Sequence, residues 1–211
     1  MKKILFIVVI LFICIIHASF SQSDTKALAR VSKMQGIEVY AMCEPLREYE
    51  TLFDVVTGAK AASLLTGGLV NEGVSDKLSQ FVTRATKEAD KRKQTIDAII
   101  YTDGKKVIAV KFTGKSTSAN KSIASVSKLE GKEVYVMNEP LKDYETTLDV
   151  STGLKAKSYV TGGLVNNSIE EDMAQYVRRA VKEAEETNTK VDAVVYTGGK
   201  RAIGVTFNKS K

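Results

Sequence analysis

The feature that most constrains the fold of this 211-residue chain is an internal duplication at a fixed offset of 95 positions. The stretch Thr-Gly-Gly-Leu-Val-Asn at residues 66–71 recurs letter for letter at residues 161–166. Aligned without a gap, residues 27–114 and 122–209 are identical at 44 of 88 positions. Such self-similarity predicts two tandem copies of one folding unit, which we call repeat 1 and repeat 2. The polar residues 115–121 between them form the predicted linker.

Residues 1–21 have the pattern of a secretory signal peptide. Two lysines precede the thirteen apolar residues 4–16, and a short stretch with small residues, 17–21, follows them. The apolar run is shorter than the roughly 20 residues that a membrane-spanning helix needs. We therefore expect cleavage after Ser21, a periplasmic or secreted mature chain, and no membrane span once the signal is removed.

Cleavage would change the charge of the chain only slightly. The formal net charge of +6 would fall to +4, because Lys2 and Lys3 are lost and no acidic residue is lost with them. The remaining basic residues are interspersed with acidic ones, whereas a nucleic-acid-binding protein usually presents a basic stripe or face. The composition therefore predicts no nucleic-acid partner.

Cleavage would also remove two residues with chemical potential. His17 is the only histidine, and the mature chain would keep Cys43 as its only cysteine. Serine triads and cysteine–histidine pairs need an imidazole, and zinc sites draw on histidine and cysteine. We therefore predict a chain that is not an enzyme and that has no metal and no cofactor. Cys43 is expected to be a half-buried packing residue, because Asn138 takes its place in repeat 2.

Carboxylates remain as candidates for acid–base chemistry. Six of them recur in repeat 2, namely Glu38, Glu44, Glu50, Asp54, Glu88 and Asp97. Acid–base catalysis needs two carboxyl groups in different environments across a cleft, and sequence spacing does not indicate such a pair here. Salt links and turn contacts are the preferred interpretation.

The pattern of each repeat predicts strand, strand, helix, strand, strand. In repeat 1, residues 37–43 and 49–56 predict two strands, and the helical spacing of apolar residues over 74–89 predicts an amphipathic helix. Residues 96–101 and 106–112 predict two further strands. The expected fold class is α+β: two tandem copies of a β-β-α-β-β unit, each with one amphipathic helix packed on a mainly antiparallel sheet.

Local signals mark the ends of these elements. Ser168 and Glu171 predict a capping box at the start of the second helix. Asp103-Gly104 and Gly198-Gly199 lie between the last two strands of each repeat and suit the positive φ angles of tight hairpin turns.

The repeated Thr-Gly-Gly stretch is the candidate binding site. Two glycines shortly before a helix could expose backbone N–H groups to an anion, although the lysine and Ser/Thr of a P-loop do not follow. The alternative is a tight turn that leads into the helix. The candidate ligand-binding residues are Thr66, Gly67, Gly68, Asn71, Thr161, Gly162, Gly163 and Asn166.

Three tyrosines are also held in both repeats. They form the pairs Tyr40/Tyr135, Tyr49/Tyr144 and Tyr101/Tyr196. Tyrosine on a half-exposed sheet face suits an interface, since its ring is apolar and its hydroxyl polar. Cross-strand packing with the hydroxyl at the sheet edge is the preferred interpretation.

A family resemblance rests on short fragments of each repeat. The order Glu133-Val134-Tyr135, Glu139-Pro140, Tyr144-Glu145, then a Gly-rich turn, a helix and Asp192-Ala193-Val194-Val195-Tyr196, resembles the YbjQ-like family of heavy-metal-binding domains. It is also similar to the related RcsF-like domains. The resemblance implies a small β/α domain that often assembles. It also implies a metal-binding role, for which the mature chain offers no histidine.

Together these features favour an exported, non-catalytic binding or interaction module of the bacterial cell envelope. Its expected partners are an envelope protein or a second copy of itself. The alternative is a binder of a small anionic ligand that uses the Thr-Gly-Gly turns before the two helices.

Overall fold

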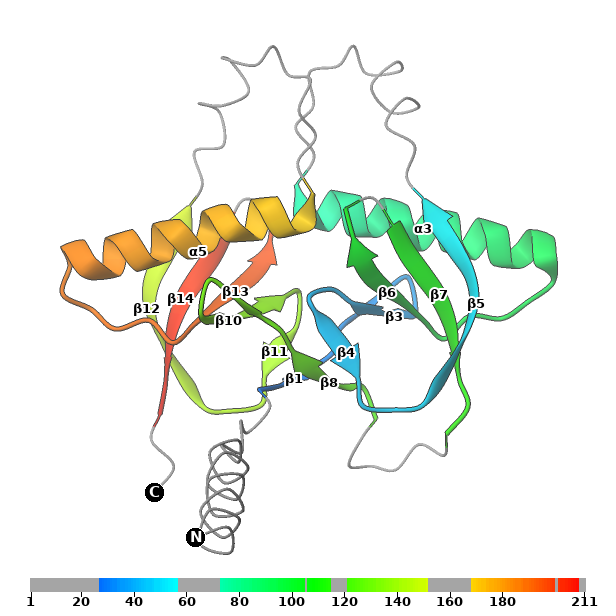
Figure 1. Cartoon of the computed structure of the whole chain (residues 1–211), viewed down its shortest axis with the longest axis horizontal. Coiled ribbons are helices and arrows are strands. Elements are labelled where there is room, and N and C mark those ends of the chain that lie inside the picture. Colours follow the sequence, from blue (N-terminus) through cyan, green and yellow to red (C-terminus); the bar gives the residue numbers. More distant parts are fainter. Residues whose placement is uncertain are drawn as a thin grey trace, which may run out of the picture.

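The computed structural model describes most of the two repeats. The described residues are 27–56, 73–104, 106–114, 121–151, 168–199 and 201–208. The predicted signal peptide, both Thr-Gly-Gly stretches and residues 115–120 of the predicted linker lie outside them. Within the described residues the chain is an α+β protein with two helices and three sheets (Figure 1).

Repeat 1 contains a five-stranded sheet with the order β2-β3-β6-β7-β5. Its strands β3 and β6 run parallel, while the other neighbouring strands are antiparallel. The sheet is therefore mainly antiparallel, with one parallel pair that the sequence did not indicate. The strands are β2 (Lys33–Met34), β3 (Ile37–Tyr40), β5 (Tyr49–Val56), β6 (Ala98–Asp103) and β7 (Lys106–Phe112).

Repeat 2 contains the equivalent sheet, with the order β12-β14-β13-β10-β9. Here β10 and β13 form the parallel pair, as β3 and β6 do in repeat 1. The strands are β9 (Lys128–Leu129), β10 (Lys132–Val136), β12 (Tyr144–Ser151), β13 (Ala193–Gly198) and β14 (Arg201–Phe207).

One amphipathic helix lies against each sheet. Helix α3 (Val74–Arg92) contacts β3, β5 and β6, and helix α5 (Ile169–Glu186) contacts the equivalent strands of repeat 2. Burial of the apolar face of each helix is the main source of helix stability in such a unit. The buried apolar side chains of both helices and part of those of both sheets belong to one cluster, so the two repeats share a core. Other buried residues of each sheet form a separate, smaller cluster.

A third sheet joins the repeats. Its order is β11-β1-β8-β4, and its strands are β1 (Leu28–Arg30), β4 (Cys43–Pro45), β8 (Ile123–Val126) and β11 (Glu139–Pro140). In the antiparallel pair β1–β8, Ala29 lies opposite Ala124, its own equivalent 95 residues later. An antiparallel pair centred on equivalent residues has a local two-fold axis. Figure 1 shows the two lobes related in this way, with the joining sheet between them.

The joining sheet corrects one prediction. The alternating run 37–43 does not form a single strand: β3 ends at Tyr40, and Cys43 begins β4 in another sheet. The break lies at Met42, whose φ of 59° is in the left-handed region and redirects the chain. Met137 has a φ of 57° at the equivalent point of repeat 2. The described repeat therefore has additional short strands beyond the predicted β-β-α-β-β order.

The local predictions at the helix and hairpin ends are confirmed. The Ser168 hydroxyl accepts a hydrogen bond from the Glu171 N–H at 3.2 Å, and the Glu171 carboxylate accepts one from the Ser168 N–H at 2.8 Å. The turn glycines Gly104, Gly198 and Gly199 have φ angles of 48°, 122° and 62°.

Candidate functional site

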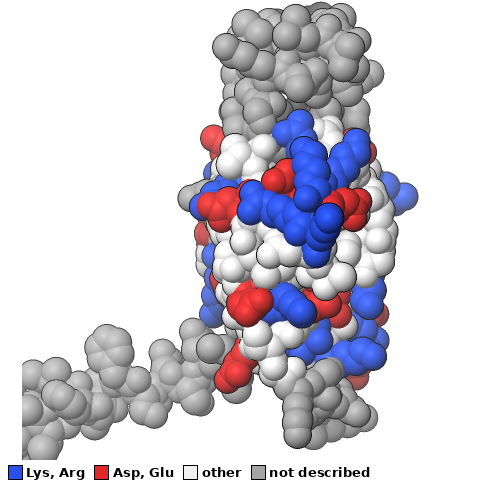
Figure 2. Space-filling model, turned by 90° about the vertical axis from the view of Figure 1, so that its right-hand side faces the viewer, with Lys and Arg blue, Asp and Glu red and all other residues white. Residues whose placement is uncertain are grey.

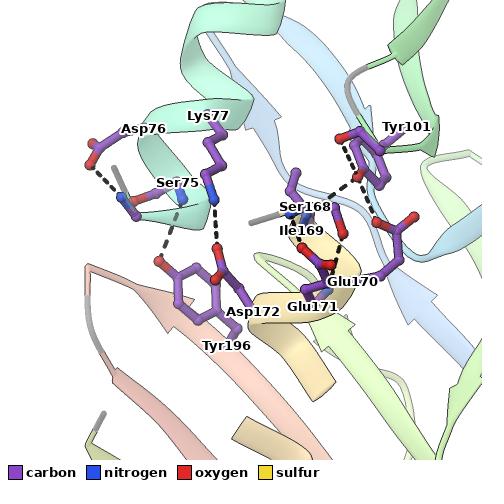
Figure 3. Close-up of polar contacts among 12 residues, drawn as sticks. Ser75, Asp76, Lys77, Tyr101, Ser168, Ile169, Glu170, Glu171, Asp172 and Tyr196 are labelled. Atoms are coloured by element: carbon purple, nitrogen blue, oxygen red, sulfur yellow. Dashed lines mark hydrogen bonds and ion pairs between the residues drawn. The ribbon is translucent and has the colours of Figure 1, made fainter. Parts of the chain in front are cut away.

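The structure brings the starts of the two helices together. Helices α3 and α5 lie end to end, with their N-termini at the centre of the molecule (Figure 1). The predicted Thr-Gly-Gly residues precede these N-termini in sequence but lie outside the described residues. We call the region where the two helix N-termini meet the helix junction; Figure 3 shows its polar contacts.

A buried ion pair lies at the centre of the helix junction. Lys77 Nζ donates to Asp172 Oδ2 at 2.6 Å, and the two side chains are 9% and 8% exposed. The two residues are 95 positions apart, so they are the same position of repeat 1 and repeat 2. Removing one partner of such a buried pair would leave a charge without compensation, which typically costs about 3–5 kcal/mol.

One tyrosine from each five-stranded sheet contacts the helix of the other repeat. The Tyr101 hydroxyl lies 2.7 Å from Glu170 Oε2 and accepts a hydrogen bond from the Ile169 N–H at 3.3 Å. In the other direction, the Tyr196 hydroxyl accepts a weaker hydrogen bond from the Ser75 N–H at 3.4 Å (Figure 3). The first N–H groups of a helix have no partner within the helix, so each tyrosine acts as a cap supplied by the other repeat.

Aromatic contacts hold these tyrosines in position. The Tyr101 ring packs edge-on against Phe81 with centroids 6.1 Å apart, and the Tyr196 ring packs against Tyr176 at 5.6 Å. Phe81 and Tyr176 are equivalent residues of the two helices. The Tyr196 hydroxyl donates to the carbonyl of Gly199, in its own hairpin turn, at 2.6 Å. The Tyr101 hydroxyl has one proton to donate, and it lies 2.9 Å from the carbonyl of Gly104 as well as 2.7 Å from Glu170. The hairpin glycines and the helices thus orient the hydroxyl groups together.

The contacts at the helix junction bear on the anion-binding alternative. The N–H groups of Ser75, Ile169 and Glu171 already donate to oxygen atoms of the protein. The first turns also carry the acidic residues Asp76, Glu170, Glu171 and Asp172. Acidic side chains there complement the positive end of the helix dipole, which is the role that a bound anion would otherwise fill.

A second pair of equivalent residues meets beside the joining sheet. The Asn138 amide Nδ2 donates to the Cys43 sulfur at 3.3 Å, while its Oδ1 accepts from the Ser32 N–H at 3.2 Å. Cys43 is 5% exposed, so the prediction of a half-buried residue is wrong: its side chain lies in a buried apolar cluster with Val31, Tyr40 and Ala124. Burial raises the pKa of the Cys43 thiol to about 12, which keeps it protonated and unreactive.

Glu38 shows what one of the recurring carboxylates does. It is buried and accepts hydrogen bonds of 2.7 Å from Tyr40, Ser122 and Arg47, and the Arg47 guanidinium lies 3.5 Å from the centroid of the Phe112 ring. Burial alone would raise its pKa, but the hydrogen bonds from Ser122 and Tyr40 and the charge of Arg47 hold the pKa of Glu38 below its ordinary value. This carboxylate is a structural salt link, as preferred from the sequence.

The counterpart of this network in repeat 2 is looser. The Tyr135 hydroxyl donates to Glu133 at 2.7 Å, but Lys142, which replaces Arg47, lies 3.6 Å from Glu133 and is 45% exposed. Ser122 belongs to the start of repeat 2, and the equivalent residue of repeat 1 is Ala27, which has no hydroxyl. Glu38 therefore adds a contact between the repeats that Glu133 does not have.

The exposed ends of the two helices differ in charge. Helix α3 ends with Lys91 and Arg92, and Lys93 follows, whereas α5 has no basic residue in its last turn. The residues equivalent to these three are Glu186, Thr187 and Asn188. Figure 2 shows lysine and arginine side chains gathered on the α3 end of the molecule. We call the exposed residues Lys87, Lys91, Arg92 and Lys93 the basic end.

The helix junction was not predicted, although one signal for it is present in the sequence. Lys77 lies three residues after Val74 and Asp172 three after Ile169, so both charged residues fall on the buried faces of their helices. A charged residue on the apolar face, with the opposite sign in the duplicate, indicates a pair. The cross-repeat roles of Tyr101 and Tyr196 carry no comparable local signal.

The described residues contain neither a metal-binding cluster nor a membrane-spanning helix. Among these residues, no group of three or more His, Cys, Asp or Glu side chains is placed to hold a metal ion. No helix in the described part of the chain is long and apolar enough to cross a membrane.

The fold and the helix junction define a class of protein: an α+β chain whose described parts pair around a local two-fold axis, with buried polar contacts between them. Comparison with known proteins finds no matching family model, no matching curated protein and no matching solved structure.

Proposed function

We propose that the chain is an exported, non-catalytic interaction module of the cell envelope, built from two tandem copies of one β/α folding unit, and that its basic end binds an acidic protein partner. The observation that carries this proposal is the difference in charge between the ends of two otherwise equivalent helices. Lys91, Arg92 and Lys93 stand where repeat 2 has Glu186, Thr187 and Asn188.

A helix of this kind does not require a basic end. Cations near a helix C-terminus are favourable, but α5 forms an equivalent helix without any basic residue in its last turn. Lys93 also occupies a left-handed conformation, with a φ of 55°. Asn188, its equivalent, has a φ of 51°, and asparagine tolerates this region better than lysine does. A role in binding explains why lysine is present at this position.

The basic end is also only partly neutralised by its own helix. Glu88 accepts a hydrogen bond from Arg92 at 2.9 Å and lies 3.4 Å from Lys91. These are exposed contacts between neighbouring turns, which contribute little to stability and which a partner can replace. The basic end therefore has a local excess of positive charge, although Glu88 and the exposed Asp90 lie between its basic residues.

The resemblance to the YbjQ-like and RcsF-like domains fits an interaction module, since it implies a small domain that assembles. The alternative of a small anionic ligand at Thr66–Gly68 and Thr161–Gly163 has less support, because the described N–H groups at the helix starts have partners within the protein. The buried state of Glu38, Lys77 and Asp172 supports structural roles for these charged groups.

Exchange of the two helix ends tests the proposal. In the mature chain, Lys91→Glu, Arg92→Thr and Lys93→Asn introduce the repeat 2 residues at the basic end, so the fold should accept them. A fluorescent poly-glutamate peptide is titrated at low and at physiological salt. We expect at least tenfold weaker binding by this triple variant at low salt, since the change removes four positive charge units from one face.

The reciprocal variant is the matched control. Glu186→Lys, Thr187→Arg and Asn188→Lys should create a second basic end and strengthen peptide binding. Vesicles with an anionic phospholipid are titrated in parallel. Equal binding of the peptide by the wild type and both variants would contradict the proposal. Binding to the vesicles but not to the peptide would also contradict it, because the partner would then be a membrane surface.

A further inference from the structure

We propose that the surface between the two repeats is a heterotypic interface, which fits the other repeat and rejects a second copy of the same repeat. The residues that select the partner are those that contact their own equivalents at the local two-fold axis. Two such pairs consist of unlike residues: Lys77 with Asp172, and Cys43 with Asn138.

The geometry of a two-fold interface gives these positions their importance. In an assembly of two identical units, a residue on the axis contacts its own copy. The β1–β8 pair shows this arrangement, since Ala29 lies opposite Ala124. If repeat 1 paired with another repeat 1, the position of Lys77 would therefore face a second lysine. A pair of repeats 2 would place Asp172 against a second aspartate.

Like charges at this position would be strongly unfavourable. The two side chains are buried at the helix junction, where water does not screen them. Each homotypic pairing would bury two charges of the same sign, whereas the heterotypic pairing gives a charge-assisted hydrogen bond of 2.6 Å. The interface is thus specific through repulsion in the wrong pair as well as attraction in the correct one.

The second unlike pair acts through hydrogen bonding. The Asn138 side chain donates to the Cys43 sulfur with its nitrogen and accepts from the Ser32 N–H with its oxygen. Two cysteines at this position would leave the Ser32 N–H without that acceptor. Two asparagines would add polar groups to a site that is buried on both sides, since Cys43 and Asn138 are each 5% exposed.

The tyrosine caps of the helix N–H groups and the alanine pair of the joining sheet do not discriminate in this way. Tyr101 and Tyr196 are the same residue in both repeats, and each caps the helix of the opposite repeat. Ala29 and Ala124 are also identical. These residues would remain in any pairing, so they stabilise the interface without selecting the partner.

Variants of the mature chain can reproduce every pairing at the axis. Lys77→Asp places two aspartates together and Asp172→Lys two lysines, as the homotypic pairs would. The double variant with both changes restores an unlike pair in reversed order. Heat unfolding of the mature chain should show a melting temperature about 10 °C lower for each single variant, because a buried pair is broken. The double variant should recover at least half of that loss.

The cysteine pair is tested in the same way under reducing conditions. Cys43→Asn and Asn138→Cys each give a like pair, and the double variant reverses the natural order. We again expect partial rescue by reversal. A control uses Arg201→Asp at the exposed ion pair with Asp149, where the melting temperature should change by no more than about 2 °C.

Recovery of stability in the reversed double variant distinguishes a residue that selects the partner repeat from one that only stabilises the fold. A residue needed only for its size or local packing would not be rescued when its partner is changed to match. If a single variant fails to fold, recovery of cooperative unfolding in the reversed double variant still supports the proposal. Single variants of Lys77 and Asp172 that melt like the wild type would overturn it. So would a reversed variant no more stable than the singles.

Discussion

Lys77 and Asp172 occupy the same position of the two repeats, 95 residues apart, and meet in a buried ion pair of 2.6 Å. A duplication normally leaves equivalent residues in equivalent but separate environments. Here the local two-fold axis brings them into contact, so divergence at a single position creates a complementary pair. This contact explains how two repeats that are identical at half of their positions can form a selective interface. The interface pairs repeat 1 with repeat 2 and rejects a second copy of either repeat.

Loss of the Tyr101 hydroxyl should destabilise the chain more than loss of the Tyr196 hydroxyl. Tyr101→Phe removes a hydrogen bond to the charged Glu170 and the acceptor of the Ile169 N–H. Tyr196→Phe removes a long contact of 3.4 Å to the Ser75 N–H and the bond to Gly199. We expect losses of about 2 and about 1 kcal/mol in the free energy of unfolding.

Urea unfolding of both variants measures this difference. The two tyrosines are equivalent residues, so each variant is the control of the other. Adding Glu170→Gln to Tyr101→Phe should cost less than Glu170→Gln alone, because the two residues share a hydrogen bond. Equal losses for the two tyrosine variants, or no loss for either, would show that the caps do not contribute to stability.

Glu38 should contribute to an acid-dependent loss of stability. Its pKa in the folded chain lies below the ordinary value of 4.5, so its contribution is present above pH 4.5 and is lost as the pH falls through the folded pKa. Glu38→Gln should therefore reduce the slope of stability against pH below pH 4.5. It should also cost about 2–4 kcal/mol at neutral pH, because Arg47, whose side chain is 10% exposed, loses its charged partner.

Urea unfolding of the wild type and Glu38→Gln between pH 3 and pH 7 gives both quantities. Glu133→Gln is the matched control, since the equivalent Lys142 contact is longer and half exposed. The control should lose less stability at neutral pH. An unchanged acid slope in Glu38→Gln would mean that other carboxylates govern the acid transition.

Cys43 should be inert in the folded chain. Its thiol is buried, and burial raises its pKa to about 12, so very little thiolate is present at pH 8. A thiol reagent such as dithionitrobenzoate should react only as fast as the chain opens, and rapidly in denaturant. Tyr101→Phe should accelerate the reaction, because it weakens the contacts between the two repeats and so makes opening of the chain more frequent. Immediate stoichiometric reaction of the folded wild type would contradict the burial of this residue.

The parts of the fold that could be predicted are those set by local sequence. Apolar spacing fixed the expected helix around residues 74–89, and the Ser168–Glu171 capping box and the positive φ of Gly104 follow from residue type alone. The break between β3 and β4 could not be predicted, because the alternating pattern continues through Met42 and methionine rarely adopts a φ of 59°.

The parts that could not be predicted depend on contacts between the repeats. The joining sheet is centred on the pairing of Ala29 with Ala124, and nothing in the residues around either alanine specifies that partner. The helix junction is a partial exception, since Lys77 and Asp172 lie on apolar helix faces with opposite charges. The Thr-Gly-Gly hypothesis concerns residues outside the described part of the chain and remains a prediction.

The mature chain should not bind zinc tightly, in spite of the family resemblance. Tight zinc sites use imidazole or thiolate, and the chain without its predicted signal peptide has no histidine and one cysteine. That cysteine is buried, and its sulfur accepts a hydrogen bond from Asn138. Carboxylate and carbonyl oxygens remain, and these suit calcium or magnesium better.

Calorimetric titration of the reduced mature chain with zinc tests this expectation, with Cys43→Ser as the control. Both proteins should give no saturable heat at micromolar concentrations. Saturable binding that is lost in Cys43→Ser would mean that the chain opens around the joining sheet and that the thiol binds metal. That result would contradict the burial of Cys43. Micromolar or tighter binding that survives the serine substitution would require a site built from oxygen ligands alone, and it would revive the metal-binding role that the resemblance implies.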